Sequence, residues 1–445
     1  GMALIAGSGF FALASGAAPV EIETAGIAPP FSINLRFGLY ESLVVFAVNL
    51  AGLLAALHYL PRLRAQAATL LLFIIMIMGI KGMVMTRDLF NLFIFIEITS
   101  LATYSLIGFE DRESLLSAGF KYVIATSVAS TFFLLGTAFI YYQTGTLNID
   151  DIIANQALIS GPVGQVALIL LLTSLLIELK PYPANGWGLD VYETAPASVA
   201  AMISVGVSAG VLFALYKMLP LFSDFLTSIA VVGGITFLVS NVIGLRQDNV
   251  KRLLGYSSIG QVGLLAMALA LLQQDGQHAY LAMIVGGLFL NHLLAKAGLF
   301  WLAGVVQREH ITAWSALAGK PWVLLVFGVL LAALIGLPPF PGFWAKWGLV
   351  LELAADSRYG WIALILVGSL LEAAYLFRWF GHALRADESA AVPVNAAALM
   401  PSALAAVLLT VSGYFTAKHA GVVPLQLFLP LYAAAALFLL DALPG

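Results

Sequence analysis

Residues 321–353 of the chain read PWVLLVFGVLLAALIGLPPFPGFWAKWGLVLEL. The stretch is almost wholly apolar and is long enough to cross the roughly 30 Å hydrocarbon core of a membrane as a helix. The run GLPPFPG at residues 336–342 interrupts it, because proline removes a backbone donor and clashes with the preceding helical turn. Lys346 follows shortly afterwards. The stretch therefore predicts a broken membrane helix that carries a lysine beside the break.

A second segment has the same features. The run LKPYP at residues 179–183 closes an apolar stretch and contains Lys180. We expect five helices between residues 67 and 217 and five between 225 and 382, with the broken helix fourth in each set. Consecutive five-helix repeats have opposite topology, and interrupted spans at matching positions of two halves are typical of a transporter site. The pattern predicts N-terminal helices, two inverted repeats and C-terminal helices, with boundaries at 1–66, 67–217, 218–382 and 383–445.

The rest of the chain has the same apolar character. Of its 445 residues, 61% are apolar and 10% are charged, whereas soluble proteins carry about 25% charged residues. Backbone polar groups must be paired inside lipid, and the apolar runs are too continuous for a barrel, so we expect an all-α integral membrane protein. About fourteen transmembrane helices are predicted, at 2–19, 38–60, 67–86, 88–108, 117–142, 163–180, 195–217, 225–246, 252–272, 279–305, 321–353, 358–382, 396–416 and 424–441.

Charges in the loops predict the orientation in the membrane. One side is the more basic and is therefore expected to be cytoplasmic, since basic loops stay inside; its residues are Arg62, Arg64, Arg112, Arg246, Lys251, Arg252, Arg308, Lys320 and Arg385. The opposite side carries fewer basic residues and has Asp150 and Asp151 in its longest internal loop. We expect the protein in the cytoplasmic membrane of a bacterium or archaeon.

Several kinds of chemistry are excluded by composition. The chain has no cysteine, so thiolate-held iron–sulfur clusters and disulfides are excluded. Metal-ligand spacing, a Ser/His/Asp set, a phosphate-binding glycine loop and a basic–aromatic patch are all missing from the sequence. We therefore expect no cofactor, no bound metal and no nucleic-acid partner, with lipid as the surrounding medium.

Ionisable residues inside the apolar spans are the candidate functional groups. A charge at the bilayer centre costs about 2.5–3.5 kcal/mol, so it needs a partner, a water-filled cavity or a function. Glu97 lies well inside its helix, and His292 and Lys296 are four residues apart, hence on one helix face. Glu97 could alternatively be a packing carboxylate, and Lys180 could extend to the membrane surface. We take Glu97, Lys180, His292, Lys296 and Lys346 as candidate proton-relay residues.

Four further residues, Ser208, Asp248, Lys251 and Glu372, are possible accessories. Glu372 lies in the middle of its span with no obvious neighbour in sequence. Asp248 and Lys251 lie at the predicted cytoplasmic start of a helix, where an ordinary orienting charge cluster explains them equally well.

The ordered motifs resemble the antiporter-like subunits of respiratory complex I, a family that includes subunits of multi-subunit sodium/proton antiporters and membrane-bound hydrogenases. The resemblance covers about residues 38–382 and is closest to the subunit N type. It rests on the run DLFNLF at 88–93 with Glu97, KP at 180–181 with DVYETAP at 190–196, DNVKRLLGYSS at 248–258, NH at 291–292 with Lys296, and GLPP at 336–339 with Lys346.

The resemblance implies a proton path along the middle of the membrane. In the family, the residues matching Glu97 and Lys180 form a pair, the one matching Lys296 is the central relay, and the one matching Lys346 is the terminal relay. It also implies other membrane subunits on both flanks, with redox chemistry in other subunits of the complex. The sequence departs from the family where a bridging lysine or histidine is usual, because Ser208 stands there, and where Asn185 replaces a usual histidine.

Three functions remain open from the sequence. The first is a non-redox, proton-translocating subunit of a complex I-like oxidoreductase that handles quinone, or of a hydrogenase-like assembly. The second is a subunit of a sodium/proton antiporter driven by ion gradients alone. The third is a structural membrane subunit whose relay is interrupted at Ser208.

Overall fold

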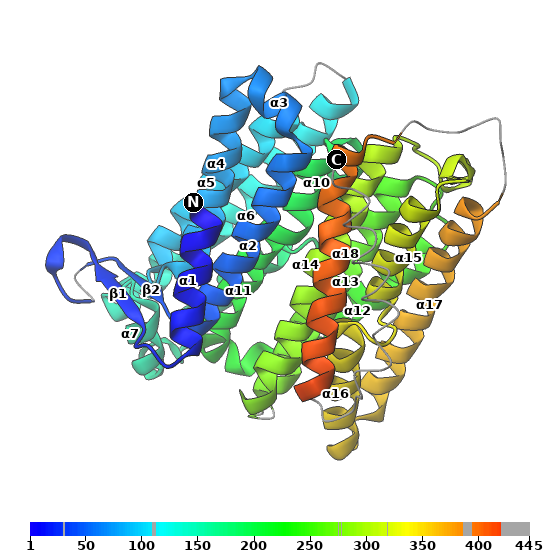
Figure 1. Ribbon diagram of the computed structural model, residues 1–445. Coiled ribbons are helices and arrows are strands. Elements are labelled where there is room, and N and C mark those ends of the chain that lie inside the picture. Colours follow the sequence, from blue (N-terminus) through cyan, green and yellow to red (C-terminus); the bar gives the residue numbers. More distant parts are fainter. Residues whose placement is uncertain are drawn as a thin grey trace. The chain divides into compact units, whose positions relative to one another are not determined.

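The computed structural model describes residues 1–29, 32–108, 113–274, 276, 278–317, 319–385 and 394–419. Helices dominate this part of the chain, and nine of the helices described there are long and apolar enough to cross a membrane (Figure 1). The predicted span at 424–441 and the loop residue Arg112 lie outside the described residues. The chain divides into two compact units.

The first unit comprises residues 1–53, 60–194 and 205–228. Most of its helices coincide closely with predicted apolar spans, since unbroken apolar runs must pair their backbone internally. Its elements are α1 Met2–Ala14, β1 Val20–Glu23, η1 Thr24–Gly26, β2 Asn34–Phe37, most of α2 Leu39–His58, α3 Leu60–Ala65, α4 Ala67–Met85, α5 Leu89–Gly108, α6 Glu113–Thr144, α7 Ile149–Ala154, η2 Gln156–Ile159, α8 Pro162–Glu178, α9 Gly186–Thr194, α11 Ser208–Met218 and η4 Leu219–Phe225.

The second unit comprises residues 54–59, 195–204 and 229–445. Long helix α14 is its centre, and α10, α13, α15, α16 and α18 pack against it. Its elements are α10 Ala197–Met202, most of α12 Leu226–Gly244, α13 Val250–Gln274, α14 His278–Val306, η5 Ile311–Leu317, α15 Pro321–Ile335, α16 Pro341–Ala355, α17 Tyr359–Ala383 and α18 Ala396–His419. The π-helical turn η3 Ile203–Val207 joins α10 to α11 and contains the boundary of the two units.

A small sheet departs from the predicted all-α fold. Strands β1 and β2 pair antiparallel, from Val20 opposite Phe37 to Glu23 opposite Asn34. Glu21 lies opposite Arg36 and their side chains form an ion pair at 3.8 Å. Each strand is only four residues long, which is too short for a clear alternating pattern in sequence. The fold is therefore mostly helical rather than all-α.

Both predicted helix interruptions are confirmed. Helix α8 ends at Glu178 and α9 begins at Gly186. Helix α15 ends at Ile335 and α16 begins at Pro341, so the predicted span 321–353 is two helices. Gly336 closes α15 in the left-handed conformation, with φ 85° and ψ 48°, and its N–H donates to carbonyls in the last turn. Glycine adopts this conformation without steric penalty, which is why it commonly ends helices.

Glycine also allows close helix packing inside each unit. A Cβ atom added at Gly136 of α6 would lie 2.9 Å from the Ala167 carbonyl oxygen of α8. In the second unit, a Cβ at Gly233 of α12 would lie 2.5 Å from the Gly263 carbonyl oxygen of α13. Small residues at these contacts let the helix backbones approach, as is typical of membrane proteins.

Candidate functional site

Lys180 lies at the first helix break. Its side chain is 2% exposed and its backbone has a φ of 60°, which is uncommon for a residue other than glycine. The ammonium donates to the Glu178 carbonyl oxygen at 3.0 Å and lies 5.2 Å from the centre of the Trp187 ring. A Cβ at Gly188 would lie 2.6 Å from the Lys180 Cδ, so this glycine leaves room for the lysine stem. The buried ammonium at this break is therefore stabilised by a backbone carbonyl oxygen and by an aromatic ring.

The carboxylates near this lysine differ from the implied pair. Glu97 accepts a hydrogen bond from the Ser130 hydroxyl, and among the described residues no ion pair within 4.0 Å joins Glu97 to Lys180. Glu178 contacts the Lys180 ammonium through its backbone carbonyl oxygen. Glu178 is 2% exposed, and its Oε1 has no hydrogen-bond partner within the described part of the chain. Glu178 lies only two residues before Lys180 in the sequence.

Lys346 lies beside the second break, on α16. Its residue is 9% exposed, and its ammonium donates to the Ile335 carbonyl oxygen at 3.3 Å. The ammonium of Lys180 makes the same kind of contact to the last turn of α8. In both places a cation lies at the carbonyl end of a helix, where the helix dipole and the unpaired carbonyls favour positive charge.

Glu372 connects the second break to the rest of its unit. Its side chain is wholly buried in α17 and lies 3.8 Å from the Lys346 ammonium. It accepts hydrogen bonds from Ser257 at 2.6 Å and from Gln261 at 2.5 Å. These two donors are one turn apart on α13, so they face the same side. The residue without an obvious neighbour in sequence is therefore the most fully engaged carboxylate at this break.

Lys296 joins the same cluster. Its side chain is fully buried, and its ammonium donates to the Ser257 hydroxyl at 2.5 Å. One hydroxyl thus accepts from Lys296 and donates to Glu372. We call Lys296, Ser257, Gln261, Glu372 and Lys346 the lysine–carboxylate cluster.

His292 lies one turn from Lys296 on α14 and is also buried. Its Nε2 is 3.3 Å from the Ser204 carbonyl oxygen in the π-helical turn, and the Ser204 hydroxyl bonds that of Ser258 at 2.7 Å. A π-turn departs from regular helical hydrogen bonding and is frequent at functional sites. Ser208, where the family has a basic residue, is buried at the start of α11 directly after this turn.

The two accessory residues at the start of α13 have contacts of a different kind. Asp248 forms an ion pair with Arg378 at 3.6 Å, and its side chain is 65% exposed, so it lies at the surface. Lys251 donates to the Ala195 carbonyl oxygen at 2.9 Å, which ties α13 to the segment before α10.

Several engaged residues were missed from sequence. Ser130, Ser257 and Gln261 are neutral, and the sequence signals for them are the motif at 248–258 that contains Ser257 and the four-residue spacing of Ser257 and Gln261. Lys217 was read as the end of a span, but it is 5% exposed and donates at 2.6 Å to the Met83 and Thr86 carbonyl oxygens. It therefore provides hydrogen bonds to backbone carbonyl groups at the C-terminal end of α4.

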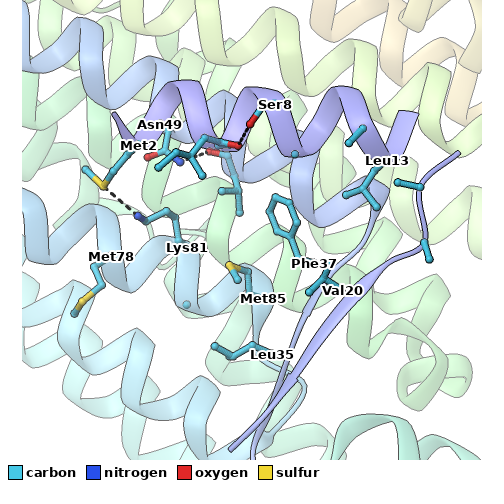
Figure 2. Close-up of a pocket in the computed structure, with 18 of the residues that line it drawn as sticks. Met2, Ser8, Leu13, Val20, Leu35, Phe37, Asn49, Met78, Lys81 and Met85 are labelled. Atoms are coloured by element: carbon cyan, nitrogen blue, oxygen red, sulfur yellow. Dashed lines mark hydrogen bonds between the residues drawn. The ribbon is translucent and has the colours of Figure 1, made fainter. Parts of the chain in front are cut away.

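A cavity of about 710 Å³ in the first unit lies apart from these residues. Helices α1, α2, α4 and α5 and the strands line it, and Lys81 is the one charged residue among the described residues of its lining (Figure 2). The Lys81 ammonium is 3.4 Å from the Met2 sulfur. None of the candidate relay residues lines this cavity. Within the described ranges, no group of three or more His, Asp or Glu side chains is arranged to hold a metal ion.

Comparison with known proteins identifies the family. Residues 86–372 match the family described as NADH:quinone oxidoreductase/Mrp antiporter, TM. The NADH-quinone oxidoreductase subunit N of Desulforudis audaxviator is 32% identical over 378 residues, covering 81% of this chain and 74% of that protein. A subunit of the Na(+)/H(+) antiporter of Alkalihalophilus pseudofirmus is 28% identical over 371 residues, covering 80% of this chain and 74% of that protein.

A solved structure agrees with these relatives. A chain of the membrane-bound sulfane sulfur reductase (MBS), an archaeal respiratory membrane complex, superposes with a TM-score of 0.84 at 29% identity, covering 99% of this chain and 92% of that one. The match spans both helix breaks, and the apolar helices make the protein integral to the membrane. The chain therefore belongs to the family of transmembrane subunits shared by NADH:quinone oxidoreductases and Mrp antiporters.

Proposed function

We propose that this chain is a proton-translocating, antiporter-like membrane subunit of a complex I-like assembly. The observation that carries the proposal is the burial of three lysines in a membrane protein, with Lys180 and Lys346 beside helix breaks and Lys296 in the middle of α14. Each ammonium has a neutral oxygen as a hydrogen-bond acceptor. Burial disfavours the charged form of an amine, and only Lys346 has a carboxylate within ion-pair distance, so these groups can release and take up a proton.

The driving event is proposed to be electrostatic. A redox step in another subunit would perturb the acidic residues around Lys180, namely Glu97 and Glu178, and the change in charge would pass to His292, Lys296 and then Lys346. Two charges about 4 Å apart interact by about 4 kcal/mol at an effective dielectric constant of 20. That is nearly three pKa units and is sufficient to drive proton exchange.

The proposed partners are further membrane subunits on both flanks. The relatives are subunits of an NADH-quinone oxidoreductase and of an Na(+)/H(+) antiporter, and this chain has no cysteine to hold an iron–sulfur cluster. In this proposal NADH and quinone are handled by the other subunits, and protons are what this chain moves.

A gradient-driven sodium/proton antiporter is the second candidate, favoured by the antiporter relative. The same lysines serve either function. Identification of the subunits that co-purify separates them: redox subunits support the first, and a wholly membranous assembly supports the second. A structural subunit interrupted at Ser208 is the third candidate, and it predicts no ion movement.

Substitution of Lys296 tests the proposal. The intact complex, with Lys296→Ala or with the interfacial control Lys320→Ala, is reconstituted into liposomes, and proton uptake and ²²Na⁺ uptake are measured during turnover. We expect Lys296→Ala to lose about 10²-fold in proton uptake, the size of effect of a typical proton-transfer group, while Lys320→Ala retains it. Unchanged proton uptake in Lys296→Ala would contradict the proposal, and loss of sodium uptake alone would support the antiporter.

We also propose that residues 67–217 and 218–382 are inverted five-helix repeats within about fourteen transmembrane helices. Support comes from the lysine at the carbonyl end of α8 and of α15. The broken helices would then enter the membrane from opposite sides. Because the chain lacks cysteine, Ser160→Cys before α8 and Thr312→Cys before α15 give single labelling sites. An impermeant thiol reagent should label Ser160→Cys from outside the cell and Thr312→Cys only from the cytoplasm; labelling from one side would refute inversion.

A further inference from the structure

The lysine–carboxylate cluster contains a continuous line of hydrogen bonds. The Lys296 ammonium donates to the Ser257 hydroxyl at 2.5 Å, and that hydroxyl donates to Glu372 Oε1 at 2.6 Å. The other carboxylate oxygen, Oε2, lies 3.8 Å from the Lys346 ammonium. Lys296 and Lys346 are on different helices, α14 and α16, so Ser257 and Glu372 are the groups that lie between them.

The charges of the cluster do not balance when every member is ionised. Two ammonium groups and one carboxylate leave one excess positive charge among buried side chains, and an uncompensated buried charge is strongly unfavourable. The cluster is neutral when only one lysine is protonated, and the other lysine is then a free proton acceptor. Nearby groups do not alter this balance: Tyr375 donates to Asn241 at 2.9 Å, and the Nε2 of His292 faces a backbone carbonyl.

We propose that Ser257 and Glu372 carry the proton between Lys296 and Lys346, an inference that rests on the proposed function. In the first step an N–H bond of Lys296 breaks as an O–H bond forms at Ser257, whose own O–H breaks as one forms at Glu372 Oε1. Lys296 and Glu372 are then both neutral, and the serine is unchanged. In the second step the Glu372 carboxylic acid gives its proton to neutral Lys346. One proton has moved, and no other reactant is needed.

The hydrogen bond from Gln261 keeps this carboxylate in place. Gln261 lies one turn beyond Ser257 on α13 and donates to Oε2 at 2.5 Å, which holds Oε1 towards the serine. Gln261 cannot exchange a proton at neutral pH, so it is a positioning residue. The same lack of titration makes glutamine a suitable replacement for Glu372, since it keeps the shape of the side chain and removes the acid.

The test compares variants of the intact complex in liposomes, with proton uptake and the rate of the driving reaction measured together. We expect Glu372→Gln and Ser257→Ala each to lose about 10²-fold in proton uptake. Glu372→Asp and Ser257→Thr, which restore an acid and a hydroxyl, should recover part of it. The matched control is Ser402→Ala, which removes another buried hydroxyl of this unit, one that bonds a backbone carbonyl of α14 at 3.0 Å.

Infrared difference spectra supply a readout that a purely structural role would not change. A band of a protonated carboxylic acid should appear during turnover, shift in Glu372→Asp and vanish in Glu372→Gln. Should Glu372→Gln fail to assemble, Ser257→Ala and Ser257→Thr with the same spectra decide the matter, because a serine relay predicts loss in the first and recovery in the second.

The outcomes separate this inference from the proposed function. If Lys296→Ala keeps full proton uptake, the proposed function and the proposed role of Ser257 and Glu372 are both contradicted. If Lys296→Ala loses uptake while Glu372→Gln retains it, the proposed function stands and the role of Glu372 is overturned. If Glu372→Gln loses uptake but Glu372→Asp recovers none and the acid band is absent from the parent protein, Glu372 is structural and the inference is equally overturned.

Discussion

The two helix breaks hold their lysines in different ways. At the first, Lys180 is held by the Glu178 carbonyl oxygen and by the Trp187 ring, all within a few residues of sequence. At the second, Lys346 bonds a carbonyl but also lies 3.8 Å from Glu372, on another helix. The contacts of Lys180 are therefore local in sequence. Lys346, in contrast, is linked through Glu372 and Ser257 to Lys296 on another helix. Similar sequence signals thus support one lysine with local contacts only and another with a carboxylate on a different helix.

The largest expected effect on stability follows from removal of the Glu372 carboxylate. Glu372→Leu removes the carboxylate that lies between Lys296 and Lys346. Breaking a buried ion pair lowers stability by about 3–5 kcal/mol, and we expect a loss of this size. Glu178→Leu should cost clearly less, since its Oε1 has no hydrogen-bond partner among the described residues. Unfolding midpoints of the purified complexes in detergent measure both. An equal or greater loss in Glu178→Leu would show that the two breaks do not differ as described.

Replacement by arginine tests proton exchange without removing the charge. Arginine keeps its proton in proteins, so Lys180→Arg and Lys346→Arg should assemble yet lose about 10²-fold in proton uptake. Proton uptake into liposomes is the measurement, with Lys320→Arg as the control. Retained uptake in either relay variant would mean that the lysine there acts only as a fixed charge.

A smaller effect is expected at the glycine that closes α15. Gly336 has a φ of 85°, and a Cβ there would lie 3.3 Å from the Lys346 ammonium. Gly336→Ala should therefore cost about 1–2 kcal/mol of stability. Gly186→Ala, which follows the first break and meets nothing within 4 Å, should change stability by less than about 0.5 kcal/mol. Thermal unfolding of the two variants gives the comparison, and equal shifts would contradict it.

The smallest effect is expected away from both breaks. Arg87 pairs with Asp150, whose side chain is 48% exposed, and such pairs contribute about 0–1 kcal/mol. Asp150→Asn should leave proton uptake unchanged and lower the unfolding midpoint slightly, with the difference shrinking at high salt. A loss of uptake would place this pair in the ion path.

Much of the fold could be predicted from sequence because the membrane restricts what the chain can do. Apolar runs must be helices in lipid, and proline runs must break them, so α8 and α15 end where the sequence indicated. The four-residue strands could not be predicted, since so short a pair carries no distinctive periodicity. The π-helical turn before Ser208 could not be predicted either, because no run of proline or glycine residues marks it in the sequence.

The candidate site was harder to predict for a physical reason. Lysines and carboxylates inside apolar spans are visible in a sequence, because their cost in lipid requires an explanation. Their partners are not visible, because Ser130, Ser257 and Gln261 are ordinary neutral residues that act through contacts between helices. For the same reason Glu372 was kept only as an accessory, although three helices meet at its carboxylate.

A double substitution tests most directly whether the buried lysines form one path. Proton uptake is measured in the reconstituted complex with Lys296→Ala, with Lys346→Ala and with both. Groups that act as a unit show strongly non-additive losses. We expect the double variant to lose no more than the worse single variant, because a path broken once is already broken. Losses that multiply would show two independent routes and would contradict a single path through Lys296 and Lys346.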